Sequence, residues 1–440
     1  KQSELTVYFF CCTVPKNRRP YRSEQGDTTV TQKLSDINFL APDVIECPYR
    51  FYAMAREEAP VYEVPGAGFY LVTRYNDVRN VLRDPGLFSS DFYQELNTPP
   101  SNPEAAAIYR SGYDTVNTLL TLDPPRHKVY RSLVNKVFSN TRVEGMTGYI
   151  QAMVTELIDD WIDDGEVDML NRFCIPLPVN VIADQLGVSR ADVGLFKRWS
   201  DACASRLSQF ADAEQQVEDA KLVLEFQQYF EQVINDRRAD PQDNIISDLA
   251  HARIDDDRLL SMEELLSVLQ QLLVAGNETT TSAIAGGVYE LAQHPEQLHK
   301  LQDDPALIPN AVEEIVRHQS PTAGIWRRVT RETELGGVAL PAGATLMIRY
   351  ASANRDERVF DDGEHVDVCR HNAGDNLAFG QGVHFCLGAQ LARKEMTVAF
   401  ESLVARTANW QLVPGKNSGL HWPNLLLRGL RELHISFDKR

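Results

Sequence analysis

The pattern of hydrophobic and polar positions along the chain predicts a mostly helical fold. In five segments, apolar residues recur every three to four positions, as in helices that bury one face. These segments are 146–161, 190–208, 213–237, 261–294 and 308–319. Shorter stretches alternate between apolar and polar residues, which is typical of small strands, and they lie at 61–64, 68–72, 333–340, 344–349 and 424–437. We therefore expect a mostly α protein with small β-sheets.

Two segments lack this periodicity. Residues 88–117 are rich in Pro, Ser, Asn and Gly and predict a long loop, which in a compact domain is usually functional. Residues 1–35 are polar and partly basic, and they predict a poorly ordered N-terminal extension. A length of 440 residues would allow two or three domains. No linker rich in Pro, Gly and Ser divides the remainder, so we expect residues 36–440 to form a single domain.

Composition narrows the class of partners. The formal net charge of −18 argues against binding to nucleic acid or to an anionic membrane surface. The apolar run 5–14 is too short to span a bilayer, so we expect no membrane anchor. Seven cysteines are scattered without the spacing of a disulfide framework, which indicates a reducing compartment and a cytoplasmic protein.

The segment 379–393, FGQGVHFCLGAQLAR, carries the strongest chemical signal. Its cysteine, Cys386, precedes a helix-forming sequence, and a thiolate near a helix N-terminus is stabilised by free backbone N–H groups and the helix dipole. Gly380, Gly382 and Gly388 lack a Cβ, so the backbone can lie close against a flat ligand. The segment therefore suits a thiolate that ligates a large planar cofactor.

Simpler interpretations of this segment are possible. A lone cysteine is most often a small buried hydrophobic residue. Gly380 and Gly382 could belong to a phosphate-binding loop, but no Walker lysine follows. His384 and Cys386 lack the second pair of ligands that a zinc site needs.

The full spacing F-G-x-G-x-H-x-C-x-G excludes most of these alternatives and resembles the haem-binding signature of the cytochrome P-450 family. The resemblance implies the cytochrome P-450 fold, in which a haem b (iron protoporphyrin IX) is buried between two long helices. It implies the Cys386 thiolate as the axial ligand of the iron. It also implies haem contacts from Ala275, Phe379, Gly380 and Gly388.

Glu314 and Arg317 stand three positions apart on the predicted helix 308–319 and can form an ion pair. Taken alone, such a pair would usually lie on the solvated surface and contribute little. The pair resembles the ExxR motif of the same family, whose ion pair stabilises the core beneath the haem. Arg370 resembles its usual third member.

Four further side chains are candidates for binding the haem propionates. His127 and Arg131 stand four apart and could contact two oxygens of one anion, although such a pair more often faces solvent. Their segment resembles the family's propionate-binding helix. The resemblance also implies a contact from His384 and one from Arg327, for which Arg328 is a close competitor. A buried dicarboxylate needs several such cations or donors.

The segment 275–280, AGNETT, lies inside the predicted helix 261–294, although Gly, Asn and Thr are poor residues for the middle of a helix. We expect the helix to open locally there for a ligand or water; the alternative is an ordinary helix with a satisfied Thr hydroxyl. The segment resembles the family's dioxygen-binding groove. That resemblance implies that Glu278 relays protons and that Thr279 hydrogen-bonds the distal oxygen.

The resemblance covers about residues 40–440 and implies a haem-thiolate monooxygenase. Such an enzyme inserts one atom of dioxygen into a hydrophobic small molecule, most simply by hydroxylation of a terpenoid, steroid, fatty acid or aromatic substrate. We expect Ala275, Ile325 and Trp326 to line the substrate pocket. Arg206 could anchor a carboxylate, although an exposed arginine on a helix is commoner. Where many bacterial members have His, this chain has Asn376.

The chain has no iron–sulfur spacing and no recognisable flavin domain, so its electrons would come from a separate ferredoxin and an NAD(P)H-dependent ferredoxin reductase. Arg126, Lys128, Arg131 and Arg393 could form a local basic patch for an acidic ferredoxin. We expect a monomer. The alternatives are a peroxide-driven haem-thiolate peroxygenase and a non-catalytic haem-based sensor or carrier; the Glu278–Thr279 pair argues against both.

Overall fold

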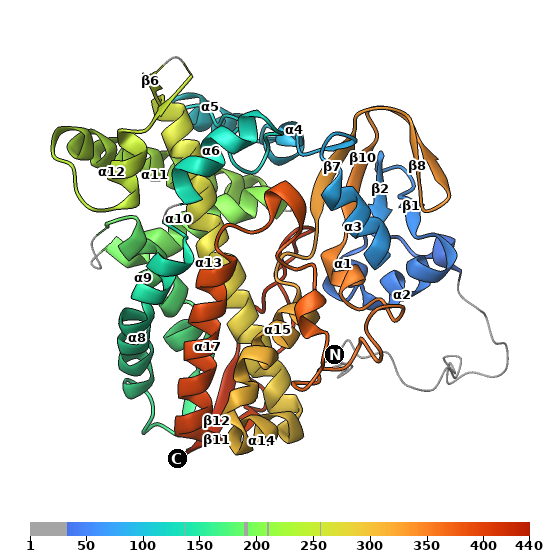
Figure 1. Cartoon of the computed structure of the whole chain (residues 1–440), viewed down its shortest axis with the longest axis vertical. Helices are drawn as coiled ribbons and strands as arrows, with labels where there is room; N and C mark the ends of the chain where they lie inside the picture. Colours follow the sequence, from blue (N-terminus) through green and yellow to red (C-terminus); the bar gives the residue numbers. More distant parts are fainter. Residues whose placement is uncertain (1–32, 136, 189–191, 209–210, 256) are drawn as a thin grey trace, which may run out of the picture.

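Helix α13 (Met262–Gln293) crosses the centre of the molecule and packs against several other long helices (Figure 1). It begins at a capping box: Ser261 Oγ accepts a hydrogen bond from the Glu264 N–H at 3.2 Å, and the Glu264 carboxylate accepts one from the Ser261 N–H at 2.7 Å. The computed structural model describes residues 33–135, 137–188, 192–208, 211–255 and 257–440.

The predicted mostly α fold is confirmed. The other helices of eight or more residues are α2 (Tyr49–Glu58), α3 (Tyr75–Arg83), α5 (Pro103–Arg110), α6 (Arg126–Asn135), α8 (Thr147–Asp159), α9 (Pro176–Gln185), α10 (Val193–Ser208), α11 (Ala213–Ala239), α14 (Pro295–Asp303), α15 (Ile308–Gln319) and α17 (Ala389–Arg406). Short helices are α1 (Pro42–Glu46), α4 (Tyr93–Leu96), α7 (Asn140–Gly145), α12 (Ile245–Ala250) and α16 (Tyr350–Ala353). The ends of the predicted helices lie within three residues of those observed, and the predicted residues 190 and 191 lie outside the described ones.

The strands form small sheets. The largest has the order β1 (Val61–Glu63), β2 (Phe69–Val72), β10 (Thr345–Ile348), β7 (Ile325–Val329) and β3 (Phe88–Ser89). A second has the order β11 (Thr407–Leu412), β12 (His434–Lys439) and β4 (Glu166–Asp168). Two-stranded ribbons pair β5 (Arg253–Ile254) with β6 (Arg258–Leu259), and β8 (Thr333–Leu335) with β9 (Val338–Leu340). In Figure 1 the largest sheet lies to one side of the long helices, with α2 and α3 beside it.

Apolar side chains from the long helices form two of the cores. Ile158, Ile284 and Leu403 belong to the core between α8, α13 and α17, and all are fully buried. Phe196 and Phe230 belong to a second core between α10, α11 and α13. Because α13 contributes to both cores, its apolar surface is buried on more than one side, which explains its weak amphipathic pattern.

Two sequence predictions are wrong in detail. The predicted loop 88–117 contains β3, α4 and α5. The side chain of Asn102 accepts hydrogen bonds from the N–H groups of Glu104 and Ala105, and Pro103 occupies the first turn, so α5 has an ordinary helix start. In the predicted strand 424–437, the regular strand begins only at His434; the earlier part pairs through isolated bridges such as His421 with Leu430.

The predicted extension 1–35 lies, up to residue 32, outside the described residues. In the described part of the chain, no helix is both long enough and apolar enough to cross a bilayer. Cys174, Cys203, Cys369 and Cys386 are free thiols, whereas Cys47 is disulfide-bonded, which the scattered cysteine spacing did not predict.

Candidate active site

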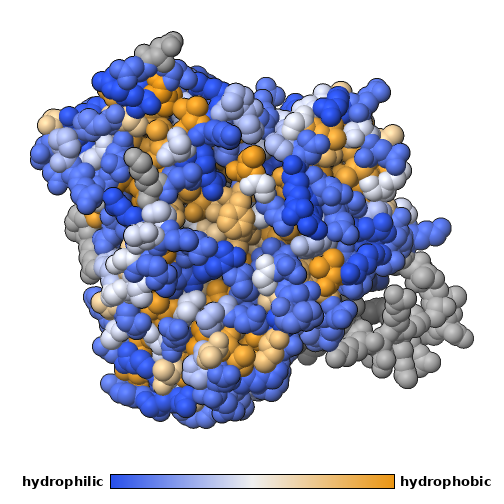
Figure 2. All heavy atoms as spheres, viewed as in Figure 1, coloured by the Kyte–Doolittle hydropathy of each residue, from blue (hydrophilic) through white to orange (hydrophobic). Residues whose placement is uncertain are grey.

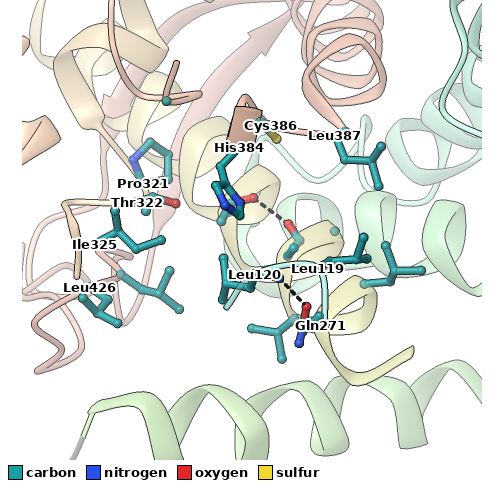
Figure 3. Close-up of a pocket in the computed structure, with 18 of the residues that line it drawn as sticks. Leu119, Leu120, Gln271, Pro321, Thr322, Ile325, His384, Cys386, Leu387 and Leu426 are labelled. Atoms are coloured by element: carbon teal, nitrogen blue, oxygen red, sulfur yellow. Dashed lines mark hydrogen bonds between the residues drawn. The ribbon is translucent and has the colours of Figure 1, made fainter. Parts of the chain in front are cut away.

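A cavity of about 380 Å³ lies between α13, α10 and the loop that leads into α17. Figure 3 shows His384 and Cys386 facing this space from that loop, with Gln271 of α13 across from them. Most of the lining is apolar, including Leu119, Leu120, Ile325, Leu387 and Leu426. An enclosed apolar space with a few polar groups is what a small-molecule or cofactor site requires.

Cys386 lies in a tight loop just before α17. Its backbone N–H donates to the Phe379 carbonyl at 2.8 Å. Gly382 has a φ of +72°, and a Cβ there would lie 2.4 Å from the Leu82 carbonyl oxygen, so the turn requires glycine. A Cβ on Gly388 would meet no atom within 4 Å, because this residue faces the open cavity. The loop therefore leaves a flat open surface beside the sulfur.

Burial raises the pKa of the Cys386 thiol, and this effect is opposed by a hydrogen bond from the Gly388 backbone and by the charges of Arg131 and Arg393. The side chain lies near the N-terminus of α17, where free N–H groups favour an anion. A positive centre placed over the sulfur would lower the thiol pKa, as metals do.

Four basic side chains gather beside this loop. Arg131, Arg327 and His384 line the cavity. His127 lies behind His384, with 4.1 Å between the ring centroids. Both ring nitrogens of His127 and Nε2 of His384 are buried without a hydrogen-bond partner in the described part of the chain.

Burial and the neighbouring positive charge of Arg327 lower the pKa of His384 to about 3, and burial also lowers the pKa of His127. Arg131 donates to the Phe385 carbonyl at 2.7 Å and Arg327 to the Trp326 carbonyl at 2.7 Å. No carboxylate of the described residues forms an ion pair with either arginine. Arg327 is buried and Arg131 is half-buried, and cations without a carboxylate partner fit a ligand that carries its own carboxylates.

The alternation of side chains along β7 determines which of residues 325–328 line the cavity. Successive side chains of a strand point to opposite faces, and Ile325 and Arg327 line the cavity whereas Trp326 and Arg328 do not. The prediction that Trp326 lines the substrate pocket is therefore wrong. Its ring packs edge-on against Phe69 in the core under the sheet, with 5.0 Å between the ring centroids.

On α13, Ala275 and Thr279 line the cavity, as expected for residues four apart on one helical face. The helix is continuous through this segment, so the expected local opening is absent. Instead, Thr279 Oγ1 donates to the Ala275 carbonyl at 2.8 Å, which is the alternative that the sequence left open.

Glu278 does not line the cavity and faces α10. Its carboxylate accepts hydrogen bonds from Ser200 Oγ at 2.8 Å and from Asn277 Nδ2 at 2.9 Å, and Lys197 Nζ lies 3.8 Å away. Burial raises the pKa of Glu278, against the opposing charge of Lys197. Glu278 and Thr279 are thus adjacent in sequence, but Glu278 faces α10 and Thr279 faces the cavity.

Glu314, Arg317 and Arg370 form a buried cluster. Arg317 contacts both carboxylate oxygens of Glu314 at 2.7 and 2.8 Å, and Arg370 Nε lies 3.0 Å from each of them. The side chains of Glu314 and Arg317 are completely buried. Arg317 also donates to the carbonyls of Asn354 and Gly363, so the cluster connects α15 to the chain that precedes the cysteine loop.

Two of the four residues of the predicted basic patch are neutralised by acids. Arg126 forms an ion pair with Asp255, and Arg393 forms one with Glu313. Asn376, at the position where this chain departs from the family pattern, donates to the same Glu313 carboxylate at 3.1 Å. Near the centre of the face shown in Figure 2, apolar side chains are exposed over the cysteine loop, and Phe385 of this loop is 39% exposed.

Sequence reasoning missed Glu395. This residue lies on α17, lines the cavity and is only 2% exposed. Its Oε2 has no hydrogen-bond partner among the described residues, and burial raises its pKa well above the usual value. The signal was present, because Leu391, Glu395 and Val398 share one helical face and both neighbours are apolar.

Gln271 was also missed. Its side chain accepts a hydrogen bond from the Leu120 N–H at 3.0 Å (Figure 3). It also donates one to Thr118 Oγ1 at 2.8 Å. Ser267, one turn earlier on α13, accepts a hydrogen bond from the Val116 N–H at 3.0 Å. These bonds attach the chain before α6 to the central helix. No feature of the sequence pairs these residues.

The fold, the cysteine at a helix start and the buried cations beside it define a haem-thiolate protein, and known proteins support this class. A family model described as cytochrome P450 matches residues 207–419. Cytochrome P450 monooxygenase PikC of Streptomyces venezuelae is 36% identical over 424 residues, covering 95% of this chain and 97% of the relative. The 6-deoxyerythronolide B hydroxylase of Saccharopolyspora erythraea is 38% identical over 396 residues, covering 89% and 96%.

Among solved structures, cytochrome P450 CYP109Q5 from Chondromyces apiculatus superposes with a TM-score of 0.80 at 34% identity, covering 92% of this chain and 99% of that one. The chain belongs to the cytochrome P450 family. It is a haem-thiolate monooxygenase, and its cofactor is a haem ligated by a cysteine thiolate. The cavity fits this group, because a free thiol, an open glycine surface and unpaired cations border one apolar space.

Proposed function

We propose that the enzyme hydroxylates a hydrophobic small molecule with dioxygen, using electrons from a separate ferredoxin and an NAD(P)H-dependent ferredoxin reductase. The observation that carries the proposal is the meeting of Cys386, the unpaired basic side chains and Thr279 around one apolar cavity. The relative from Saccharopolyspora erythraea is a hydroxylase, which supports this reaction type. Terpenoid, steroid, fatty acid and aromatic substrates are all compatible with the lining.

Each part of the cavity has an assigned role in this proposal. Cys386 ligates the iron, and Ala275, Phe379, Gly380 and Gly388 contact the ring. His127, Arg131, Arg327 and His384 hold the two propionates, and Glu314, Arg317 and Arg370 stabilise the fold behind the cysteine loop. When bound, the haem supplies the oxidising power, and the thiolate ligand favours cleavage of the O–O bond.

Proton delivery is assigned to Thr279 and Glu278. The Thr279 hydroxyl lies on the cavity wall and can exchange its bond to the Ala275 carbonyl for one to a ligand or water. Because burial raises the pKa of Glu278, its carboxyl group holds a proton more readily than an exposed glutamate does. Ser200 and Lys197 connect this carboxyl to α10, where the Lys197 side chain is 27% exposed.

The electron donor is proposed to approach at the cysteine loop, where Phe385 is exposed. Because Arg126 and Arg393 are paired with acids, attraction by the predicted basic patch is weaker than the sequence suggests. Residues 36–440, acting as one monomeric domain in the cytoplasm, complete the proposal. The match over 97% of the PikC chain supports one domain. Four free thiols support a reducing compartment, and the disulfide-bonded Cys47 is the observation against it.

The test is turnover under isotopically labelled dioxygen with a surrogate ferredoxin, its reductase and NADPH. The proposal predicts product that carries one labelled oxygen atom and a matching consumption of NADPH. Product formed only with hydrogen peroxide would instead favour a peroxygenase. A substrate-induced shift of the haem spin state without product in either system would favour a sensor or carrier.

A further inference from the structure

A second cationic position in the cavity lies away from the propionate-binding side chains. Arg206 is in the last turn of α10 and lines the cavity together with Cys203, one turn earlier. Its Cζ lies 4.6 Å from the centroid of the Tyr109 ring. The positive charge of Arg206 also reaches the Tyr93 hydroxyl, whose pKa is raised by burial and lowered by Arg206.

Arg206 has no anionic partner within the described part of the chain. Its Nε is buried without a hydrogen-bond acceptor, and no carboxylate of the described residues forms an ion pair with its guanidinium. The buried acid in this region, Asp219, is engaged elsewhere, since it accepts a hydrogen bond from Gln215 Nε2 at 2.7 Å. Leaving a donor of this kind unpaired in an apolar wall costs free energy unless a ligand supplies the acceptor.

The chain offers a contrast on the same helix. Arg198 of α10 is 56% exposed and pairs with Glu225 at 3.9 Å, as an ordinary surface arginine does. The lack of an anionic partner at Arg206 therefore follows from its position and not from its residue type. Its surroundings are a cavity whose remaining wall is mainly apolar, with Val274, Leu119 and Leu120 in the lining.

We propose that the substrate is amphipathic and that Arg206 binds its anionic end, a carboxylate or a phosphate, while its apolar body extends along α13 toward Thr279 and Cys386. This inference rests on the proposed function, and it names the substrate class for that same cavity. A guanidinium binds both anions with paired N–H donors, so the shared chemistry is an oxyanion at the end of an apolar molecule.

The geometry also predicts where such a substrate is oxidised. Cys203 of α10 and Gln270 of α13 are neighbours that both line the cavity, which gives the level of the last turns of α10 against α13. Thr279 lies nine residues further along α13, which is roughly 13 Å at 1.5 Å per residue. Oxidation should therefore occur far from the anionic end.

The test compares ligands of equal chain length by the spin-state shift of the ferric holoenzyme. The probes are dodecanoate, dodecyl phosphate and 1-dodecanol. At least one anion should bind roughly 10- to 100-fold more tightly than the alcohol, the range expected for charge-assisted hydrogen bonds. The preferred anion identifies the headgroup as a carboxylate or a phosphate.

Variants then assign the preference. Arg206→Gln should reduce the affinity for the anion to about that for the alcohol, and Arg206→Lys should keep part of the preference because it keeps the charge. Arg198→Gln should behave as the unchanged protein does. Equal binding of anions and alcohol, including no shift with any probe, would overturn the inference. An Arg206→Gln variant that keeps the preference for the anion would also overturn it. So would a variant that binds the anion and the alcohol more weakly by the same factor, because the role of Arg206 would then be limited to stacking on Tyr109.

Failure of this inference can be told apart from failure of the proposed function. A preparation that shows the carbon monoxide spectrum of a thiolate-ligated haem and turns over with ferredoxin, but has no anion preference, overturns only the role of Arg206. A preparation without that spectrum overturns the proposed function itself.

Discussion

At the scale of single residues, Thr279 and Ser282 make the same local hydrogen bond in different surroundings. Both hydroxyls donate to the carbonyl oxygen four residues earlier, at 2.8 and 2.7 Å. Only Thr279 lines the cavity. Substitutions of these two residues therefore distinguish the loss of a side-chain hydrogen bond within the helix from the loss of a hydroxyl at the reaction site.

Thr279→Ala should retain haem and substrate binding but lower the fraction of NAD(P)H that appears in product roughly tenfold or more, with peroxide as the alternative product. The physical reason is the loss of the hydroxyl that can hold a proton next to the bound oxygen. Parallel assays of NAD(P)H, product and peroxide measure this fraction. Ser282→Ala is the matched control and should leave coupling unchanged; equal coupling in all three proteins would remove Thr279 from this role.

Arg327 and Arg328 provide a second matched pair. Because only Arg327 lines the cavity, Arg327→Gln should accelerate haem loss roughly 10- to 100-fold through the loss of charge-assisted hydrogen bonds. The rate of haem transfer to an excess of apomyoglobin measures this. Arg328→Gln should lose haem at nearly the original rate, and equal acceleration in both variants would contradict the assignment of the propionate contact to Arg327.

The role of a residue could be predicted from the sequence where its surroundings depend on its neighbours along the chain. Cys386 and its glycines lie in one continuous segment whose turns need those residue types. The choice between Arg327 and Arg328 was not accessible, because it depends on the register of β7 against β10, where Arg327 pairs with Leu346. Trp326 failed as a prediction for the same reason.

At the scale of elements, the buried cluster around Glu314 connects α15 to the chain that precedes the cysteine loop. Glu314→Gln would leave two arginines buried beside a neutral partner, and it should lower the free energy of unfolding by about 3–5 kcal/mol. Denaturant unfolding of the holoenzyme measures the change. On α11, Glu218 and Lys221 have the same spacing but are solvent-exposed, so Glu218→Gln is the control and should leave stability nearly unchanged. Equal effects of the two substitutions would contradict the structural role of the cluster.

The helices were predicted more accurately than the segments that bear on substrate choice. Helix α15 has the predicted bounds because its apolar face is regular, and α13 begins one residue after Ser261 because of the capping box. Helix α5 was missed although Asn102 and Pro103 mark its start, since the polar composition around it indicated a loop. The attachment of residues 116–120 to α13 joins positions about 150 residues apart, for which local patterns carry no information.

At the scale of the whole molecule, His421 connects the chain near its C-terminus to Glu46 near its N-terminal side. The His421 ring and backbone N–H both lie within hydrogen-bond distance of the Glu46 carboxylate, at 2.9 and 2.8 Å. Burial and the charge of Arg428 lower the pKa of His421 to about 4, in spite of Glu46. Neither Glu46 nor His421 lines the cavity, so this pair reports on the stability of the fold itself.

A histidine whose folded pKa lies below its unfolded value contributes stability above pH 6.5 and loses it as the pH falls toward the folded value. The free energy of unfolding should therefore decrease between about pH 6.5 and 4, with roughly 3 kcal/mol of the decrease due to His421. Unfolding curves at several pH values should show a shallower decrease for His421→Asn. His371 is exposed, and His371→Asn is the control that should keep the original slope; identical slopes in all three proteins would contradict the assignment.

The site is built around the Cys386 thiolate, which we propose as the axial ligand of the haem. The carbon monoxide difference spectrum of the reduced protein tests this assignment most directly, and Cys203→Ser is the matched control because Cys203 is also a free thiol that lines the cavity. We predict the red-shifted band of a thiolate-ligated haem in the unchanged protein and in Cys203→Ser, and its loss in Cys386→Ser. Retention of the band in Cys386→Ser, or its absence from the unchanged protein, would contradict the account.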